Sequence, residues 1–385
     1  MAAQIDKLGV IVAALIGYAV SVAPFATSRA NRIVPGEAKS ILAALPAGSG
    51  VALVALLLVV ALLALARTPV TIRLVASLGG LLALAAAIGF SARFLTPPDN
   101  AYARVAPASG FWLLVFALSL LTTDAIARLK PRPFFRVALL AAAAAAVVVI
   151  LKLGMWDGLS IMKEYGSRAD TFWNEARRHV VLAIGSLAAA AVVGLPLGIL
   201  CHRIPHLRAG VLNVLNIIQT IPSIALFGLL IAPLGWISVH VPGAAAIGIR
   251  GIGVAPAFVA LFLYSLLPMV ANTVVGLAGV PREANEAARG IGMTDWQRLV
   301  GVELPLALPV ILTGVRIVLV QNIGLATIAA LIGGGGFGVF VFQGIGQTAM
   351  DLVLLGAVPT VALAFAAAIC LDAMTDLTAN YGRVE

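Results

Sequence analysis

Apolar segments of nearly constant length recur along the whole chain, and this repetition limits the fold more than any other feature. The segments run for roughly 17–25 residues between short polar connections, the length that a helix needs to cross about 30 Å of hydrocarbon. Hydrophobic residues make up 62% of the 385 residues and charged residues 11%, against about 45–50% and about 25% in soluble domains. The sequence therefore predicts an all-α, polytopic transmembrane helical bundle and excludes a water-soluble globule.

We expect about ten spans of about 20 residues each. They are predicted at residues 8–25, 50–66, 70–90, 109–127, 136–154, 179–201, 209–235, 253–278, 306–332 and 352–374. The remaining residues are divided among so many loops that none can form a separate soluble domain. Any catalytic domain that drives the protein must therefore be on another chain. The first span could also be a cleaved signal peptide, but it has only Lys7 as a positive charge and Asp6 stands beside it. We expect it to be retained.

The charge pattern points to topology and not to nucleic acid. The formal net charge of +9 arises from 25 Lys and Arg against 16 Asp and Glu, and the basic residues are scattered through the loops. Nucleic-acid binding would need them to converge on one face. With the N-terminus inside, Arg128, Lys130 and Arg132 fall in a short cytoplasmic loop, as the positive-inside rule requires. The two cysteines, Cys201 and Cys370, imply no disulfide framework.

The polar content of the apolar segments divides the chain into an N-terminal extension and a core whose spans contain polar residues. Residues 1–154 hold about five spans with few polar side chains beyond Ser and Thr, as in segments that face lipid or pack on other helices. Residues 155–178 are polar with interspersed aromatic residues, which predicts an extracytoplasmic interfacial segment. Residues 179–378 form the predicted core of about five spans, followed by a cytoplasmic tail at 379–385.

The loop between the eighth and ninth predicted spans, residues 279–309, is too ordered to be a simple connector. Pro281 suits the first turn of a helix, and Gly290 with Gly292 supplies a place to stop and turn. Thr294 and Gln297 have the spacing of a capping box that opens a second short helix, and Pro305 would then begin the next span. We interpret this loop as a docking surface; the alternative is a solvated amphipathic connector.

The loop also carries a long motif of fixed spacing. Glu286-Ala287-Ala288 is followed at set distances by Gly292 and by Val302-x-Leu304-Pro305, which resembles the EAA loop of membrane subunits of binding-protein-dependent ABC importers. Further segments resemble permeases for glycine betaine, choline and related quaternary-amine osmoprotectants. These are Gln219–Ser223, Leu263–Pro268 with Asn272-Thr273, Gly314–Arg316, and Ala329–Gly333. The resemblance covers about residues 175–378, and the N-terminal extension is similar to that of the Yeh-type subset.

The resemblance implies a type I ABC importer permease core preceded by about five extra transmembrane helices. It implies four kinds of partner: a dimer of cytoplasmic ATPase subunits, a second permease subunit that is a copy or a paralogue, an extracytoplasmic substrate-binding protein, and membrane lipid. No cofactor is expected on this chain, because ATP and magnesium would be bound by the ATPase, and no nucleic acid is expected. The coupling loop, 279–305, would contact the ATPase through Glu286, Ala287, Ala288, Gly292, Leu304 and Pro305. The implied location is the bacterial inner membrane, multi-pass, with both termini inside.

A polar side chain within a span should face the bundle interior or a wet cavity. Candidates for the translocation pathway are Asn216, Gln219, Tyr264, Asn272, Arg316 and Asn322. Each could instead form an interhelical hydrogen bond that only holds the bundle together. Arg316 is the basic residue that we place deepest in a span, where it would either line the route or bind backbone carbonyls or an acidic group of the other subunit.

Other motifs do not predict a site. Gly333, Gly335 and Gly338 match a dinucleotide-binding pattern only by spacing, since no strand precedes them. No Walker A motif occurs, so we expect no ATP hydrolysis by this chain. His202 and His206 are separated by Pro205 and lack an accompanying Glu, so we expect no metal site. The functional alternatives are a permease for another small polar solute, an ion-coupled secondary transporter, or a structural or sensory membrane subunit.

Overall fold

The computed structural model describes residues 6–31, 34–66, 68–97, 99–100 and 102–381. The described chain forms two compact units. The first contains residues 1–132 and 141–167, and the second contains residues 133–140 and 168–385. The predicted tail 379–385 lies outside the described residues from 382 onward.

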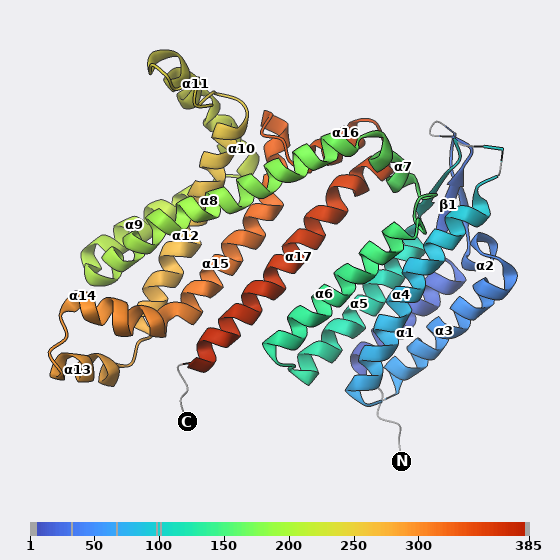
Figure 1. Ribbon diagram of the computed structural model, residues 1–385, viewed down its shortest axis with the longest axis horizontal. Coiled ribbons are helices and arrows are strands. Elements are labelled where there is room, and N and C mark those ends of the chain that lie inside the picture. Colours follow the sequence, from blue (N-terminus) through green and yellow to red (C-terminus); the bar gives the residue numbers. More distant parts are fainter. Residues whose placement is uncertain (1–5, 32–33, 67, 98, 101, 382–385) are drawn as a thin grey trace. The chain divides into compact units, whose positions relative to one another are not determined.

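The first unit is a bundle of long apolar helices. Its helices are α1 (Lys7–Ser21), α2 (Ile41–Ala44), α3 (Ala47–Leu65), α4 (Val70–Leu95), α5 (Ser109–Leu129), most of α6 (Pro133–Lys152), and α7 (Ser160–Ser167). α1 packs on α3 and α5, and α4 packs on α5 (Figure 1). A Cβ atom at Gly9 would lie 1.9 Å from the carbonyl oxygen of Ala64, so only glycine permits the close approach of α1 to α3.

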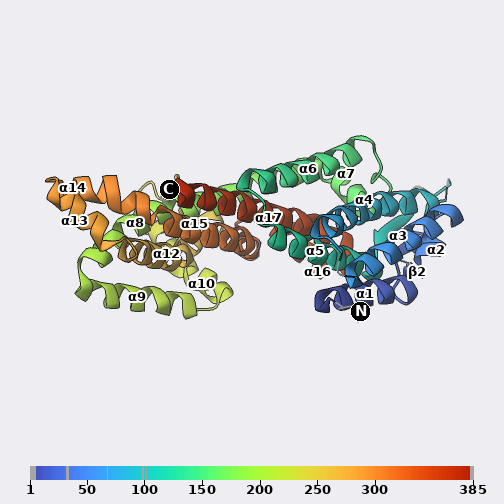
Figure 2. The same ribbon diagram turned by 90° about the horizontal axis from the view of Figure 1, so that it is seen from below.

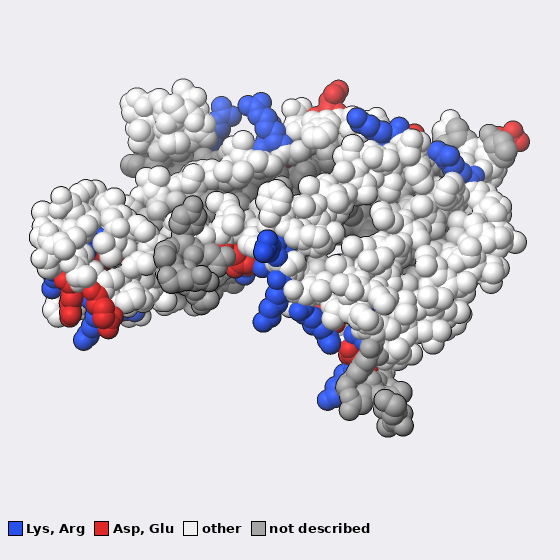
Figure 3. All heavy atoms as spheres, turned by 60° about the horizontal axis from the view of Figure 1, so that its bottom comes forward, with Lys and Arg blue, Asp and Glu red and all other residues white. Residues whose placement is uncertain are grey.

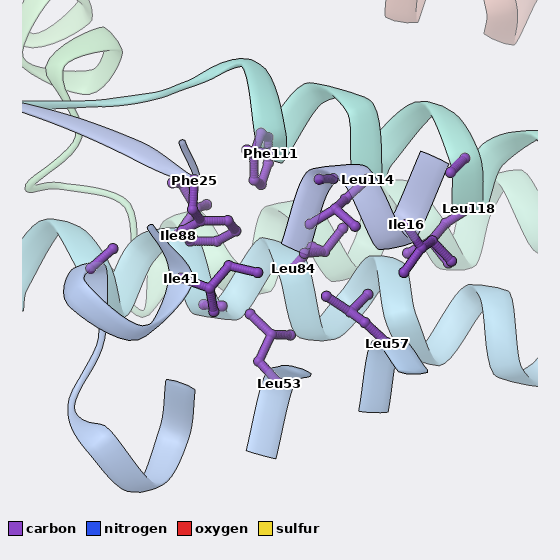
Figure 4. Packing of buried hydrophobic residues seen from close by; sticks show 14 of the residues in the cluster. Ile16, Phe25, Ile41, Leu53, Leu57, Leu84, Ile88, Phe111, Leu114 and Leu118 are labelled. Atoms are coloured by element: carbon purple, nitrogen blue, oxygen red, sulfur yellow. The ribbon is translucent and has the colours of Figure 1, made fainter. Parts of the chain in front are cut away.

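The core of this unit is one large apolar cluster. Figure 4 shows side chains from α1, α3, α4 and α5 pointing toward one another, with Phe25 and Phe111 at one end. The two rings meet edge to face with centroids 5.8 Å apart. Leu84, Leu114 and Leu118 are completely buried between them and the neighbouring helices. The cluster is continuous, so movement of one of these helices would disturb the packing of the others.

A small sheet stands outside the long helices of this unit. β1 (Ala26–Arg29) pairs antiparallel with β2 (Glu37–Lys39) and with β3 (Arg104–Pro107), in the order β2-β1-β3. The pairing satisfies the backbone N–H and C=O groups of connections that leave the helices. Next to it, Arg104 donates to the buried Glu164 carboxylate of α7 at 2.8 Å.

Four long helices form the frame of the second unit. They are α8 (Ala169–Arg203), α12 (Val254–Ala278), α15 (Leu304–Ala326) and α17 (Met350–Tyr381). α12 packs on α8 and α15, and α15 packs on α17 (Figure 1). A Cβ atom at Gly198 would lie 2.6 Å from Thr273 Cβ, and one at Gly314 would lie 2.8 Å from Asn272 Cβ. Small residues therefore let these helices approach closely, as is usual in membrane bundles.

Shorter elements complete this unit. They are α9 (Pro205–Thr220), α10 (Ser223–Leu229), α11 (Ile231–His240), α13 (Arg282–Gly290), α14 (Asp295–Arg298), the π-helical segment η1 (Leu299–Glu303), the 3₁₀ segment η2 (Ile328–Ile332) and α16 (Gly338–Gly346). α9 lies along α12 (Figure 2). The span predicted at 209–235 is not one helix, because Pro222 ends α9 at Thr220 and the chain restarts as α10.

Nine helices within the described residues are long and apolar enough to cross a membrane, and the shorter apolar helix α1 precedes them. The nine spans are Ala47–Leu65, Val70–Leu95, Ser109–Leu129, Pro133–Lys152, Ala169–Arg203, Ser223–His240, Val254–Ala278, Asp295–Ala326 and Met350–Ala379. The prediction of an all-α, polytopic bundle is confirmed. The residues expected to form an interfacial segment, 155–178, include α7 and the first ten residues of α8.

Candidate functional site

The predicted coupling loop consists of two short helices joined by a glycine turn. α13 follows Pro281, and Gly292 adopts a φ of +82°, which a residue with a side chain rarely tolerates. Thr294 and Gln297 form the expected capping box, with Gln297 N–H donating to Thr294 Oγ1 at 3.3 Å and Thr294 N–H donating to Gln297 Oε1 at 2.9 Å. Both predicted helices are confirmed, and Figure 3 shows acidic and basic side chains together at this end of the unit.

The expectation that Pro305 begins the next span is confirmed in part. α15 begins at Leu304 with Pro305 in its first turn, but no break precedes it, because the helix continues from α14 through η1 into α15. Pro305 has no N–H to donate and its ring would crowd the carbonyl four residues earlier in a regular α-helix. The wider turn of the π-helical segment Leu299–Glu303 accommodates that ring without breaking the helix.

The motif residues of the loop differ in exposure. On α13, Glu286 and Ala287 are exposed, whereas Ala288 is buried. Gly292 and Pro305 are exposed and Leu304 is half-buried. α13 is strongly amphipathic, so the exposed side that carries Glu286 and Ala287 is available to a partner while Ala288 holds the helix against its own chain.

A charge cluster with Glu303 and Arg298 buried at its centre lies behind this loop and was not predicted from the sequence. Glu303 accepts from Arg203 Nη2 at 2.6 Å through Oε2 and from Arg298 Nε at 2.9 Å through Oε1. Glu303 is 4% exposed and Arg298 is 3% exposed. Arg203 lies 100 positions before Glu303 in the sequence, so no local pattern links them. The only available signal was that Glu303 stands between apolar residues at the beginning of a span.

An open cavity of about 310 Å³ lies between α13 and the end of α8. Glu303 and both of its arginine partners line it, together with Glu286. The remaining lining residues are His202, Arg282, Asn285 and Arg289. Basic side chains predominate, so the cavity is suited to a polar or acidic partner and not to an apolar one.

Asn322, a candidate for the pathway, lies in a completely buried hydrogen-bonded cluster. Its amide donates to Ser186 Oγ and to Ser265 Oγ, both at 2.9 Å, and thereby links α15 to α8 and α12. Both serines also donate to backbone carbonyls of their own helices. These contacts favour the second of the two predicted roles for Asn322, an interhelical hydrogen bond that holds the bundle together.

Gln219 and Tyr264 are brought together, as the end of α9 meets the middle of α12. Gln219 Nε2 donates to the Tyr264 carbonyl at 2.8 Å, and the Tyr264 hydroxyl donates to the carbonyl of Ile221. The two bonds attach the proline break after α9 to a membrane-spanning helix. Tyr264 is 5% exposed and Gln219 is half-buried.

The remaining two amide candidates are separate from these clusters. Asn272 is half-buried and donates to the Pro268 carbonyl of its own helix at 2.8 Å. Asn216 is exposed on α9. Of all the pathway candidates, Asn216 is therefore the one most open to a solute or to another subunit.

Arg316 has an acidic partner within its own chain. Its guanidinium forms an ion pair with Asp372 of α17, and Arg136 Nη1 contacts the second oxygen of that carboxylate at 2.6 Å. Arg136 also pairs with Asp376 at 2.6 Å. Backbone carbonyls or an acid of another subunit were expected from the sequence, and the span predicted at 352–374 ended two residues after Asp372. α17 continues to Tyr381, so Asp372 lies about 13 Å inside that helix.

The glycine run after η2 forms a turn. Gly333, Gly335 and Gly336 have φ values between +78° and +87°. Glu175 Oε2 accepts from the Gly336 N–H at 2.6 Å, and His179 Nδ1 accepts from the Phe337 N–H at 3.3 Å. The turn is thus attached to α8. Within the described residues no group of three or more His, Cys, Asp or Glu side chains could hold a metal ion.

These features define a multi-pass membrane permease: a helical bundle with polar interhelical contacts and an exposed two-helix loop. Residues 194–380 match the family of binding-protein-dependent transport system inner membrane components, and residues 6–162 match the N-terminal domain of the ABC transporter permease YehY. The chain belongs to this family of inner membrane transport components. The resemblance inferred from the loop motif is therefore confirmed.

Several relatives support this assignment. The osmoprotectant import permease protein OsmW of Salmonella typhimurium is 46% identical over 47% of this chain and 79% of its own length. The carnitine transport permease protein OpuCB of Listeria monocytogenes is 37% identical over 49% of this chain and 78% of its own length. The choline transport system permease protein OpuBB of Bacillus subtilis is 37% identical over 48% of this chain and 78% of its own length.

Proposed function

We propose that this chain is the membrane-spanning permease subunit of an ATP-driven importer for osmoprotectants such as glycine betaine, choline or a related quaternary amine. The observation that carries the proposal is the α13–α14 loop. It exposes Glu286 and Ala287 while Ala288 is buried, in a chain whose relatives are named as osmoprotectant, carnitine and choline permeases. A short amphipathic helix presented in this way suits insertion into a groove of a partner.

The proposed complex contains a dimer of cytoplasmic ATPase subunits, which would bind ATP and magnesium, and a second permease subunit. A substrate-binding protein would deliver the solute from outside. The loop that meets the ATPase would be cytoplasmic, and counting spans outward from it with α1 included puts both termini inside. The basic loop Arg128–Arg132 falls on the same side, as the positive-inside rule requires.

We further propose roles for the predicted domains and site residues. Residues 1–154 act as an N-terminal extension, residues 155–178 lie at the outer surface, and residues 179–378 form the transporting core. Glu286, Ala287, Ala288, Gly292, Leu304 and Pro305 serve coupling. Among the pathway candidates, Asn216 is best exposed to meet a solute, whereas the contacts of Asn322, Gln219 and Tyr264 favour a role in holding the helices.

The test is solute uptake by proteoliposomes that hold the complete complex. We expect ATP-dependent uptake of labelled glycine betaine or choline that requires the binding protein. Vesicles with only this chain and its ATPase should show no substrate-stimulated hydrolysis, because no loop described in the second unit forms a ligand-closing domain. Uptake driven by an ion gradient without ATP would support a secondary transporter. ATP-driven uptake of another small polar solute alone would overturn the substrate class.

A further inference from the structure

The coupling loop joins the membrane helices at both of its ends. Residues 279–281 connect α12 to α13, and after α14 the helix continues through η1 directly into α15. α13 also contacts η1, so Leu299–Glu303 is one route by which a force on α13 reaches the membrane helices. π-helical segments are short, uncommon and frequent at functional sites.

An apolar cluster fixes this junction from one side. Leu299 packs with Leu277 and Val280 at the end of α12 and with Ala307 and Ile311 of α15. Leu195 and Ile199 of α8 pack against the same cluster. The hydrophobic effect is non-directional, so this cluster holds the three helices together but does not by itself link the loop to one particular residue of α8.

The hydrogen bonds of Glu303 are directional, unlike the contacts of the apolar cluster. Each Glu303 carboxylate oxygen accepts from a different arginine, one at the last residue of α8 and one at the end of α14. Bonds between ionised groups are short and geometrically demanding. Arg203 is also well placed at a helix C-terminus, where the helix dipole favours a cation.

We propose that Glu303, bound by Arg203 and Arg298, is the joint that transmits movement of the coupling loop to α8 and α15. This inference rests on the proposed function and extends it, since it assigns the transmission step to positioning residues that do not belong to the exposed docking surface. α8 and α15 move together with the loop because both are attached to one buried carboxylate.

Glu303 and the residue that we propose to contact the ATPase differ in exposure. Glu303 is 4% exposed whereas Glu286 is exposed on α13, so a partner that contacts Glu286 need not contact the Glu303 carboxylate, although both residues line the same open cavity. Loss of the Glu303 charge should therefore leave binding of the ATPase intact and weaken the link between ATP hydrolysis and transport.

The experiment compares Glu303→Gln with the parent complex in proteoliposomes that contain the ATPase and the binding protein. The amide keeps the shape of the side chain and removes its charge. We expect the ATPase to co-purify in the parental ratio, whereas stimulation of ATP hydrolysis by ligand-loaded binding protein falls roughly tenfold, within the range typical of coupling between sites. Parental stimulation and parental transport per ATP in Glu303→Gln would overturn the proposal.

A double variant separates transmission from stability. Glu303→Gln alone leaves Arg203 without its carboxylate partner and Arg298 with only Asp295, which is destabilising; combining it with Arg203→Met removes the unpaired charge at Arg203. We expect the double variant to recover much of the melting temperature of the complex and to remain uncoupled. Recovery of stimulation together with the melting temperature would show that the cluster is only structural and would overturn the proposal.

The chain offers a matched control. Glu164 is 2% exposed and accepts from Arg104 at 2.8 Å in the first unit. Glu164→Gln should lower the melting temperature without changing transport per ATP. If the parent complex itself shows no ATP-driven uptake, the proposed function fails and this inference fails with it. A coupled parent with a coupled Glu303→Gln variant contradicts only the inference.

Discussion

The two units differ in how their interiors are built. The first has a large continuous apolar cluster that joins α1, α3, α4 and α5. The second has several smaller clusters, and polar contacts such as that of Asn322 with Ser186 and Ser265 lie between its helices. A continuous close-packed core resists rearrangement, whereas small clusters joined by directional bonds can shift as separate bodies. The difference indicates a rigid first unit and a second unit built to move.

The largest expected effect tests the rigidity of the first unit. Leu118→Ala removes a completely buried side chain of α5, and such truncations cost about 2–5 kcal/mol. Thermal unfolding of the purified complex should show this loss, while transport per ATP at permissive temperature stays parental. Leu82→Ala, at a side chain that is 53% exposed, is the control. A change of coupling in Leu118→Ala would break the comparison, because the first unit would then take part in the motion.

The next effect concerns the docking surface of the second unit. Glu286→Lys reverses an exposed charge on α13, and a hot-spot side chain contributes about 2 kcal/mol or more to binding. Co-purification of the ATPase should fall while membrane insertion stays normal. Gly292→Val should act in the same direction because Gly292 has a φ of +82°.

Glu37→Lys makes the same charge reversal at an exposed position of β2 and should leave the ATPase bound. If Glu286→Lys and Gly292→Val both transported normally, the assignment of the coupling loop would have to be abandoned.

A smaller effect is expected from Arg316→Gln. Arg316 and Asp372 are 39% and 41% exposed at their side chains, and ion pairs of that exposure contribute about 0–1 kcal/mol. If the pair is structural, the melting temperature and assembly should fall slightly, and Asp372→Asn, which also removes a partner of Arg136, should lower both at least as much. If Arg316 lines the route, assembly should be normal and the preference between betaine and choline should change. An unchanged complex by all three measures would exclude both roles.

The smallest expected effect tests whether polar contacts join the helices of the second unit. Asn322→Ala removes the amide that bridges α8, α12 and α15, and interhelical hydrogen bonds in membranes average about 0.6 kcal/mol. Ser186 and Ser265 keep their bonds to backbone carbonyls, so no buried hydroxyl is left unpaired. Differential scanning calorimetry should detect a loss of this size, with the exposed Asn213→Ala as control. A changed substrate preference would instead place Asn322 on the route.

Local features were readable from the sequence because local forces produce them. Span-length apolar blocks predicted the membrane helices, and the Thr294–Gln297 spacing predicted the capping box that opens α14. The continuation of α14 into α15 was missed, since a proline at position 305 ordinarily indicates a helix start and only the π-helical turn allows it inside a longer helix.

The partners of the buried polar groups were decided by the tertiary structure. Glu303 and Arg203 are 100 residues apart, Asn322 and Ser186 are 136 apart, and β1 pairs with a strand that follows α4. In a water-soluble helix an apolar stripe would fix which face turns inward. These spans are apolar on every side, as lipid requires, so their sequence determines that they cross the membrane but leaves their rotation to the packing of small residues and to the few polar groups that find one another.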